Sequence, residues 1–316
     1  MTETPTVVGG PFDGSVVPSL GGHEIEGLEL ESTNVWGLFR TRGDEPHIVQ
    51  VMRRLSQVEA WPPRLLLQSN FGVAGMRRHR IELMAARSRD VESCATGSGW
   101  RFTADADEGA QPFELSIEHG SARWAEGQIL DVSGEEVTPG LQWCLIPDAG
   151  GEGMRYASQI FKIEGTFEGI EVDGFLGVDQ VHLVPGRQHY VDDPMTAAHL
   201  SDAWCTWATA YDDGSIECGH VSFGAGGFGF ALRASDRTAH VAERVTGEVV
   251  SVSDGCPMQI SVDIDGEAWE FVADGRGLPI EPVPGPVRQA EGWFRRVGET
   301  RHPVVWCATP EIPNEP

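Results

Sequence analysis

The stretch EGTFEGIEVDGFLGVDQVHLV, residues 164–184, contains the main signals for the fold of this chain of 316 residues. Apolar and polar side chains alternate along it, and the dipeptides Glu168-Gly169 and Asp173-Gly174 favour tight turns between strands. Similar dipeptides recur later, at Asp213-Gly214 in YDDGSIECGHV and at Asp265-Gly266 in ISVDIDGEAWEFV. Strand-like runs flank each of them, so we predict tight turns between antiparallel strands at all four positions.

The rest of the chain has the same β pattern. Runs such as GWRFTADA and FELSIEHG alternate between apolar and polar residues, and no long window keeps the helical i, i+3, i+4, i+7 spacing without Gly or Pro. The 39 glycines and 20 prolines interrupt the chain at short intervals. We therefore expect an all-β protein with too many strands for one small sandwich, arranged as a large barrel or as two barrels.

Two places in the chain could separate domains. The Gly-rich run AGGEG, residues 149–153, is the better boundary, and it divides the chain into β domains of residues 1–150 and 151–316. A looser connection is PGRQHYVDDPMTAAHL, residues 185–200, where a cluster of Pro and Asp ends the strand pattern and a short helix could form.

The composition argues against several classes of partner and site. The chain has 23 Lys and Arg against 48 Asp and Glu, and this net charge of −25 disfavours binding to nucleic acid or to an anionic membrane surface. No run reaches the roughly 18 apolar residues of a membrane helix, and the first residues lack the pattern of a signal peptide. We expect a cytoplasmic protein with no membrane insertion. Its six cysteines show no zinc-ligand spacing, so we expect reduced, mostly buried thiols.

Motifs that bind common cofactors are missing. The sequence contains no GxSxG, no GxxxxGK[ST] and no HExxH, and GAGGFGF at residues 224–230 has no helix after it to hold a dinucleotide. The histidines are not spaced as pairs of metal ligands. We expect neither a metal nor a cofactor.

Asp179 is the one acid in an otherwise apolar strand-like run. If residues 175–183 form a strand, Phe175, Asp179, Val181 and Leu183 share one face, while Gln180 and His182 lie on the other. Burial without a cationic partner raises the pKa of a carboxyl group, as a general acid near neutral pH requires. The alternative is a buried acid satisfied by backbone amides or by an arginine. Gly177 favours the first interpretation because it leaves room for a ligand.

The two strands that follow are rich in aromatic residues and glycine. In AWCTWATAYDDG, Trp204 points to one face of the strand while Trp207 and Tyr211 point to the other. In VSFGAGGFGFAL, Phe228 alternates with glycines that can leave space beside an aromatic wall. Trp143 adds further aromatic surface. These residues form either a packed core or the wall of a pocket, and ten Trp against three Tyr favour an apolar ligand.

The run KIEGTFEGIEVDGFLGVDQVHLV, the strand AWCTWATAYDDG and the late EGWFRRV together resemble the lipocalin-like double-barrel group. This group includes carotenoid 1,2-hydratases, AttH-like proteins, tocopherol cyclases and kievitone hydratases. The resemblance implies two consecutive calycin-type β-barrels with a hydrophobic cavity and cofactor-independent acid–base chemistry on isoprenoid or similar substrates. Asp179 matches the family's acid, whereas Gln180 stands where the family has His.

Three hypotheses for the function follow. In the first, a protonated Asp179 delivers its proton to a hydrophobic substrate, and hydration, dehydration, cyclisation or isomerisation follows; the protein is then a lyase or an isomerase. His182 or Gln180 positions water or carries the second proton. Phe175 and the aromatic residues named above, Trp143, Trp204, Trp207, Tyr211 and Phe228, shape the substrate site. In the second, the same cavity carries a hydrophobic small molecule without chemistry. In the third, the barrels are filled and the protein only makes interactions.

Overall fold

The computed structural model describes residues 6–12, 24–25, 27–43, 46–56, 64–69, 75–78, 91–96, 99–106, 111–146, 152–197, 200–235, 238–280 and 287–313. Nearly all the regular structure in these ranges is β, as the sequence predicts, and their one α-helix, α1 (Pro194–Ala197), is a single turn. No described helix is long and apolar enough to cross a membrane. None of the six cysteines is bonded to another, and four of them are buried.

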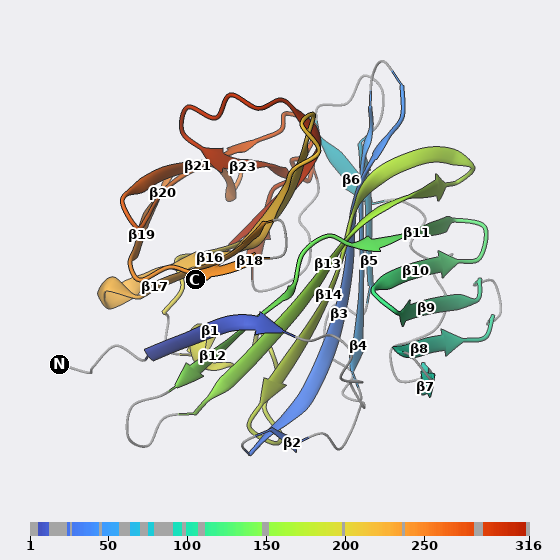
Figure 1. The fold of residues 1–316 in the computed structure, drawn as a ribbon, viewed down its shortest axis with the longest axis horizontal. Helices are drawn as coiled ribbons and strands as arrows, with labels where there is room; N and C mark the ends of the chain where they lie inside the picture. Colours follow the sequence, from blue (N-terminus) through green and yellow to red (C-terminus); the bar gives the residue numbers. More distant parts are fainter. Residues whose placement is uncertain are drawn as a thin grey trace.

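The largest sheet has fourteen strands and curls around a core of its own. Its strands are β1 (Thr6–Phe12), β2 (Glu24–Ile25), β3 (Leu28–Thr41), β4 (Ile48–Ser56), β5 (Arg64–Ser69), β6 (Met76–Arg78), β7 (Glu92–Thr96), β8 (Gly99–Ala104), β9 (Phe113–Glu118), β10 (Ser121–Glu126), β11 (Leu130–Glu136), β12 (Gly140–Ile146), β13 (Met154–Phe167) and β14 (Ile170–Leu183). The three longest, β3, β13 and β14, cross the middle of the molecule, with the short strands β7–β11 on one side (Figure 1).

Three of the four turns predicted from the sequence are confirmed. Glu168 and Gly169 both have positive φ, 48° and 79°, in the turn between β13 and β14, and Asp265 and Gly266 repeat this with 55° and 87°. Gly214 lies in the connection between β15 and β16. The turn predicted at Asp173-Gly174 is wrong, because both residues lie inside β14 and pair with β13 and β3. Gly174 is needed there for another reason: a Cβ would collide with the carbonyl oxygen of Leu38.

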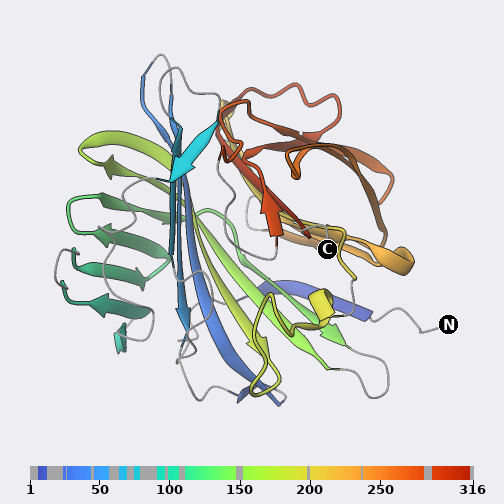
Figure 2. The ribbon, with the colours of Figure 1, turned by 180° about the vertical axis from the view of Figure 1, so that it is seen from behind.

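The chain from residue 203 onward forms a second unit of two smaller sheets. The six-stranded sheet contains β15 (Ala203–Tyr211), β16 (Ile216–Phe223), β17 (Gly229–Ser235), β18 (Thr238–Val241), β22 (Val287–Gln289) and β24 (Pro303–Pro313). The four-stranded sheet contains β19 (Val245–Ser253), β20 (Cys256–Ile264), β21 (Glu267–Ala273) and β23 (Gly292–Arg296). Trp207, Trp269 and Phe294 are buried in the core of this unit, which lies against one side of the large sheet (Figures 1 and 2).

The boundary between the sheets falls later in the chain than the domain boundary predicted from the sequence. β13 and β14, which the sequence analysis placed in the second domain, are central strands of the first sheet. The break between sheets falls between Leu183 and Ala203, in the looser connection recognised in the sequence. The run at residues 149–153 joins two neighbouring antiparallel strands, β12 and β13, and its first three residues lie outside the described ranges.

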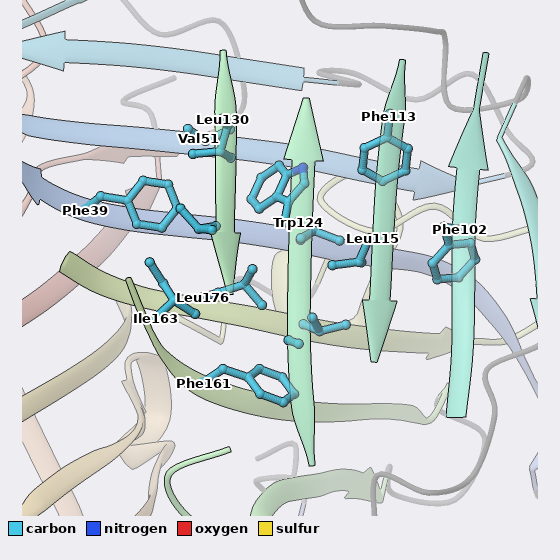
Figure 3. Packing of buried hydrophobic residues seen from close by; sticks show 14 of the residues in the cluster. Phe39, Val51, Phe102, Phe113, Leu115, Trp124, Leu130, Phe161, Ile163 and Leu176 are labelled. Carbon is cyan, nitrogen blue, oxygen red and sulfur yellow. The ribbon is translucent and has the colours of Figure 1, made fainter. Parts of the chain in front are cut away.

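The core of the large sheet is built by alternation along short strands. In β8, β9 and β10, buried residues occupy every second position, which directs Phe102, Leu115 and Trp124 inward. These side chains belong to one cluster with Phe39 and Phe161 of the long strands (Figure 3). A buried ion pair lies in the same region, where Arg53 Nη2 is 2.7 Å from Glu126 Oε2 and both side chains are 1% exposed.

A third hydrophobic cluster joins the two units. It contains residues of β12, β13 and β14 from the large sheet and residues of β15, β16, β17 and β24 from the second unit. Polar contacts between the units add to it, including the bond from Arg40 Nη1 to Asp274 Oδ2 at 3.2 Å. The expectation of an all-β, lipocalin-like fold is therefore confirmed, and its two units share a continuous apolar interface.

Candidate active site

Asp179 lies in the middle of β14 and faces the second unit. It pairs with Ser158 on β13 and with Asn34 on β3, and it is 3% exposed. Val181, two positions along the strand, belongs to the cluster between the units, whereas Val178 belongs to the core of the large sheet. The alternation read from the sequence therefore holds, and it places Asp179 on the face that meets the second unit.

The two carboxyl oxygens of Asp179 have different surroundings. Oδ2 accepts hydrogen bonds from Trp36 Nε1 and from the hydroxyl of Tyr156, both at 2.7 Å. Oδ1 is buried and has no hydrogen-bond partner among the described residues. An ionised carboxylate would leave a strong acceptor unpaired at Oδ1, whereas a neutral acid can carry its proton there.

The pKa of Asp179 reflects this environment. Burial raises it from 3.8 to about 6, and neighbouring hydroxyl and indole groups oppose the rise. Ser158, directly opposite on β13, opposes the rise most, although its hydroxyl meets no hydrogen-bond criterion among the described residues. No described arginine or lysine forms an ion pair with Asp179 within 4.0 Å, so the alternative of an acid satisfied by an arginine does not apply.

Gly177 has a different role from the one expected. The sequence suggested that its missing side chain leaves room for a ligand. A Cβ at Gly177 would instead collide with the indole ring of Trp36, so the vacant space is filled by the ring that donates a hydrogen bond to Asp179. The glycine therefore acts indirectly, by letting Trp36 reach the carboxyl group.

Aromatic rings from both units surround Tyr156, whose hydroxyl donates a hydrogen bond to Asp179. The ring of Tyr156 stacks on Trp143 at 5.6 Å and meets Trp204 edge-on at 5.2 Å. His220 of β16 also contacts Tyr156 and Trp204, with ring centres 5.6 Å and 5.2 Å away. The result is an aromatic cluster of Trp143, Tyr156, Trp204 and His220 that spans the interface between the units.

Several buried polar atoms of this region lack a partner. His220 Nδ1 is 3.0 Å from Thr206 Oγ1, but Nε2 has no hydrogen-bond partner among the described residues. Trp143 Nε1 and His189 Nδ1 are also buried and unpartnered within the described part of the chain. Burial lowers the pKa of His220 to about 3, so its ring is neutral. Unpaired buried donors and acceptors are costly, and these three belong to rings around Tyr156, as a site for a partly polar ligand requires.

His182 and Gln180 are not brought to Asp179. Both lie on the opposite face of β14, and His182 Nδ1 is 3.3 Å from Arg155 Nη1. β14 does shift register at Val181/His182, but only against β3. Its pairing with β13 continues without interruption, so the alternation of β14 itself is kept and His182 is not turned toward Asp179.

The predicted substrate residues separate into two groups. Trp143, Phe175 and Phe228 lie in the cluster between the units, and Trp204 packs against it. Trp207 packs on Phe294 in the core of the second unit, with ring centres 4.7 Å apart. Tyr211 lies under the guanidinium of Arg301 and hydrogen-bonds to Glu217. Only the first group is placed to line a site near Asp179.

A hollow of about 1150 Å³ also lies on the large sheet, and its lining comes mainly from β9, β10, β11 and β13. It contains none of the residues predicted from the sequence, and many of its lining side chains are charged, including Arg42, Glu136 and Lys162. An apolar substrate would not suit this surface. The interface at Asp179 combines an acid with an aromatic wall and is the better candidate.

Sequence reasoning missed Trp36, Tyr156 and His220. Tyr156 and Asp179 come from neighbouring strands, but Trp36 lies 143 residues before Asp179 and His220 lies in the other unit. One weak signal was present: Tyr156 is one of only three tyrosines, and it stands in an apolar strand where its hydroxyl needs a partner.

Comparisons with known proteins agree with this fold. No family model matches the chain, and no curated protein matches it. Among solved structures, a candidate AttH from Nitrosomonas europaea matches with a TM-score of 0.54 and 13% identity, over 94% of this chain and 99% of that one. Kievitone hydratase from Nectria haematococca matches with a TM-score of 0.48 and 9% identity, over 96% and 98%. CghA bound to Sch210972 matches with a TM-score of 0.40 and 12% identity, over 97% of this chain and 98% of that one. The likeness to the AttH structure shows that the two chains share a fold.

Proposed function

We propose that this protein is a cofactor-independent acid–base enzyme that acts on a hydrophobic substrate of isoprenoid, steroid or polyketide-like type. The reaction is a hydration or dehydration, a cyclisation or an isomerisation, and Asp179 is the proton donor. The observation that carries the proposal is the unequal pairing of its carboxyl group. Both hydrogen-bond donors are on Oδ2, and the buried Oδ1 is left to hold the proton.

The chemistry follows from the environment of that proton. A pKa of about 6 leaves a fraction of Asp179 protonated near neutral pH, where the acid is also strong enough to give its proton away. Protonation of an alkene, or loss of a protonated hydroxyl group, creates positive charge on carbon. The faces of Tyr156, Trp204 and Trp143 are electron-rich and stabilise such a charge. With Asp179 only 3% exposed, substrate entry requires the side chains above it to separate.

Deuterium transfer provides a test that does not depend on knowing the product. The protein is incubated in deuterated buffer with a panel that includes an isoprenoid alkene, a tertiary allylic alcohol, a steroid alkene and a polyketide-like polyene. Mass spectrometry then measures deuterium bound to carbon. We expect Asp179→Asn to lower turnover by about 100-fold or more, the usual contribution of a general acid. Asp212→Asn, at an exposed position, is the matched control. A folded Asp179→Asn protein with unchanged turnover would rule out this role.

The alternative is a carrier of a hydrophobic molecule. It is favoured by the position of His182 and Gln180, neither of which can serve Asp179 as a second proton carrier from the opposite face of β14. Native mass spectrometry of the protein as isolated separates the two functions. A ligand that co-purifies and is released unchanged, together with no deuterium transfer on the panel, would favour the carrier.

A further inference from the structure

A second carboxyl group approaches the site from the other unit. Glu311 lies on β24 and pairs directly with Trp204 of β15. Residues directly opposite in an antiparallel pair have their side chains on the same face, so Glu311 shares the face of Trp204 that meets Tyr156. Glu311 is half-buried, and its carboxyl group accepts partly buried hydrogen bonds from Tyr190. The interface therefore receives one acid from each unit.

Tyr190 holds Glu311 in this place. Its hydroxyl donates to the carboxylate, 3.0 Å from Oε2 and 3.3 Å from Oε1. Tyr190 has a φ of 65°, a conformation that costs a bulky residue energy and persists only where its surroundings impose it. Two contacts do so: its backbone N–H donates to Asp193 Oδ2 at 2.7 Å, and its ring stacks on His189 at 3.9 Å.

The two acids are electrostatically coupled. Burial raises the pKa of Glu311 to about 7, the Tyr190 hydroxyl opposes the rise, and negative charge on Asp179 raises it further. Other titratable or charged groups act on this pair or on the tyrosines that hold it: Tyr156, His189, Asp193 and Arg54. Two carboxyl groups with similar pKa values in one buried region titrate as a pair, so adding the first proton disfavours adding the second.

We propose that Asp179 and Glu311 form one acid–base pair across the two units, in which Glu311 takes up the proton that the substrate or its attacking water gives up. This proposal rests on the proposed function and supplies the second proton carrier that His182 and Gln180 do not provide. Glu311 meets the geometric need because it lies beside Trp204, whose ring contacts Tyr156, and Tyr156 donates to Asp179.

The steps balance for each reaction. In a hydration, the alkene electron pair takes the proton from Asp179, an oxygen lone pair of water forms the new C–O bond, and Glu311 removes a proton from that oxygen. The substrate has then gained one water, Asp179 is ionised and Glu311 is protonated. The proton returns to Asp179 against the difference in pKa, which is about 6 for Asp179 and about 7 for Glu311. In a dehydration, the hydroxyl oxygen takes the proton from Asp179 and the C–O bond breaks to release water. Glu311 then removes a proton from the neighbouring carbon, and the C–H electron pair becomes the double bond. In a cyclisation or an isomerisation, Glu311 removes a proton from the carbon next to the cation, and the C–H electron pair becomes the new double bond.

A titration without substrate tests the pairing. In the full chain labelled with ¹³C in the Asp and Glu carboxyl groups, each signal is assigned by its loss in Asp179→Asn or Glu311→Gln. We expect Asp179→Asn to lower the pKa of Glu311, because Asp179 is ionised before Glu311 titrates. Glu311→Gln should lower the pKa of Asp179 by less, because Glu311 is still largely protonated when Asp179 titrates. Glu291→Gln removes another buried carboxyl group, one that accepts bonds from Ala308 N and Thr309 Oγ1, and should move neither value. The pairing is overturned if the pKa of Glu311 is unchanged in Asp179→Asn and the pKa of Asp179 is unchanged in Glu311→Gln.

Kinetics then separate the pair from the proposed function. On a panel substrate that the wild type converts, we expect Glu311→Gln to lower kcat about 100-fold, to leave KM within about threefold and to abolish the acidic limb of the pH profile. Near-ultraviolet circular dichroism checks that the variant is folded. If Asp179→Asn is inactive while Glu311→Gln keeps the full rate and both limbs, the pair is refuted and the proposed function stands. If both variants keep full activity, the proposed function itself fails. Coupled titration without conversion of any panel substrate supports the pair and counts against the proposed substrate class.

Discussion

Replacing Asp179 by Asn should stabilise the folded protein at neutral pH while it removes activity. The carboxyl group is held in a place that disfavours its charge, and the cost can be worked out from its pKa. The folded value of about 6 exceeds the ordinary value of 3.8 by about 2.2 units. At about 1.4 kcal/mol per unit, ionised Asp179 costs the folded state about 3 kcal/mol. Asparagine has nearly the same shape, and its carbonyl oxygen can accept the bonds that Oδ2 accepts from Trp36 and Tyr156.

The pH dependence distinguishes this cause from others. Because the folded pKa is raised, the folded state holds the proton more tightly than the unfolded chain does. The favourable contribution of protonated Asp179 is fully present below about pH 4 and is lost as the pH rises to about 6. The stability difference between Asp179→Asn and wild type should therefore be near zero at pH 4 and grow to about 3 kcal/mol at pH 8.

Urea unfolding at intervals between pH 4 and pH 8 measures this difference directly. Groups that titrate equally in both proteins cancel, so only Asp179 and the residues coupled to it contribute. The exposed substitution Asp212→Asn changes the net charge by the same amount and is the control. A variant that is less stable than wild type at pH 8, or a difference that does not change with pH, would contradict a raised pKa of Asp179 as the cause.

Three further predictions concern the surroundings of the site and the core. Tyr156→Phe removes a donor that favours the charged form, so the pKa of Asp179 should rise by about one unit in a ¹³C NMR titration; an unchanged value would contradict the role of this bond. Gly177→Ala should displace the indole that donates to the same carboxyl group and cost about 1–3 kcal/mol of stability in urea unfolding, unless the ring can move freely. Glu126→Gln leaves the buried guanidinium of Arg53 without its carboxylate, and should cost about 3–5 kcal/mol by the same measurement; a loss below about 1 kcal/mol would show that the pair contributes little.

Local chemistry made much of the fold predictable. Strand alternation, the Glu168-Gly169 and Asp265-Gly266 turns and the absence of helical periodicity all depend on residues close in sequence, and the structure confirms them. The failures come from interactions that are not local. Asp173-Gly174 reads as a turn, yet it lies within β14, because strands on both sides satisfy its backbone and Gly174 admits the close approach of β3.

The candidate site was predictable only in part, for the same reason. Alternation predicts that Asp179 lies on the opposite face of its strand from Gln180 and His182. It also predicts that Trp204 and Trp207 lie on opposite faces of theirs. The structure agrees with both predictions. No local rule states which face of each strand meets the other unit. Trp207 was therefore assigned to the substrate together with Trp204, although it packs inside the second unit.

The residue pattern alone indicates that this chain is all β, that Asp179 lies on an apolar face and that aromatic strands follow it. Side chains repeat every two residues along a strand, and this period needs no knowledge of distant contacts. The groups that contact this acid depend on tertiary packing. Trp36 lies 143 residues away in sequence, and His220 and Glu311 belong to another unit. Their approach depends on strand pairing and on the packing of two sheets, and these set the hydrogen bonds, the burial and the charge that give Asp179 its pKa.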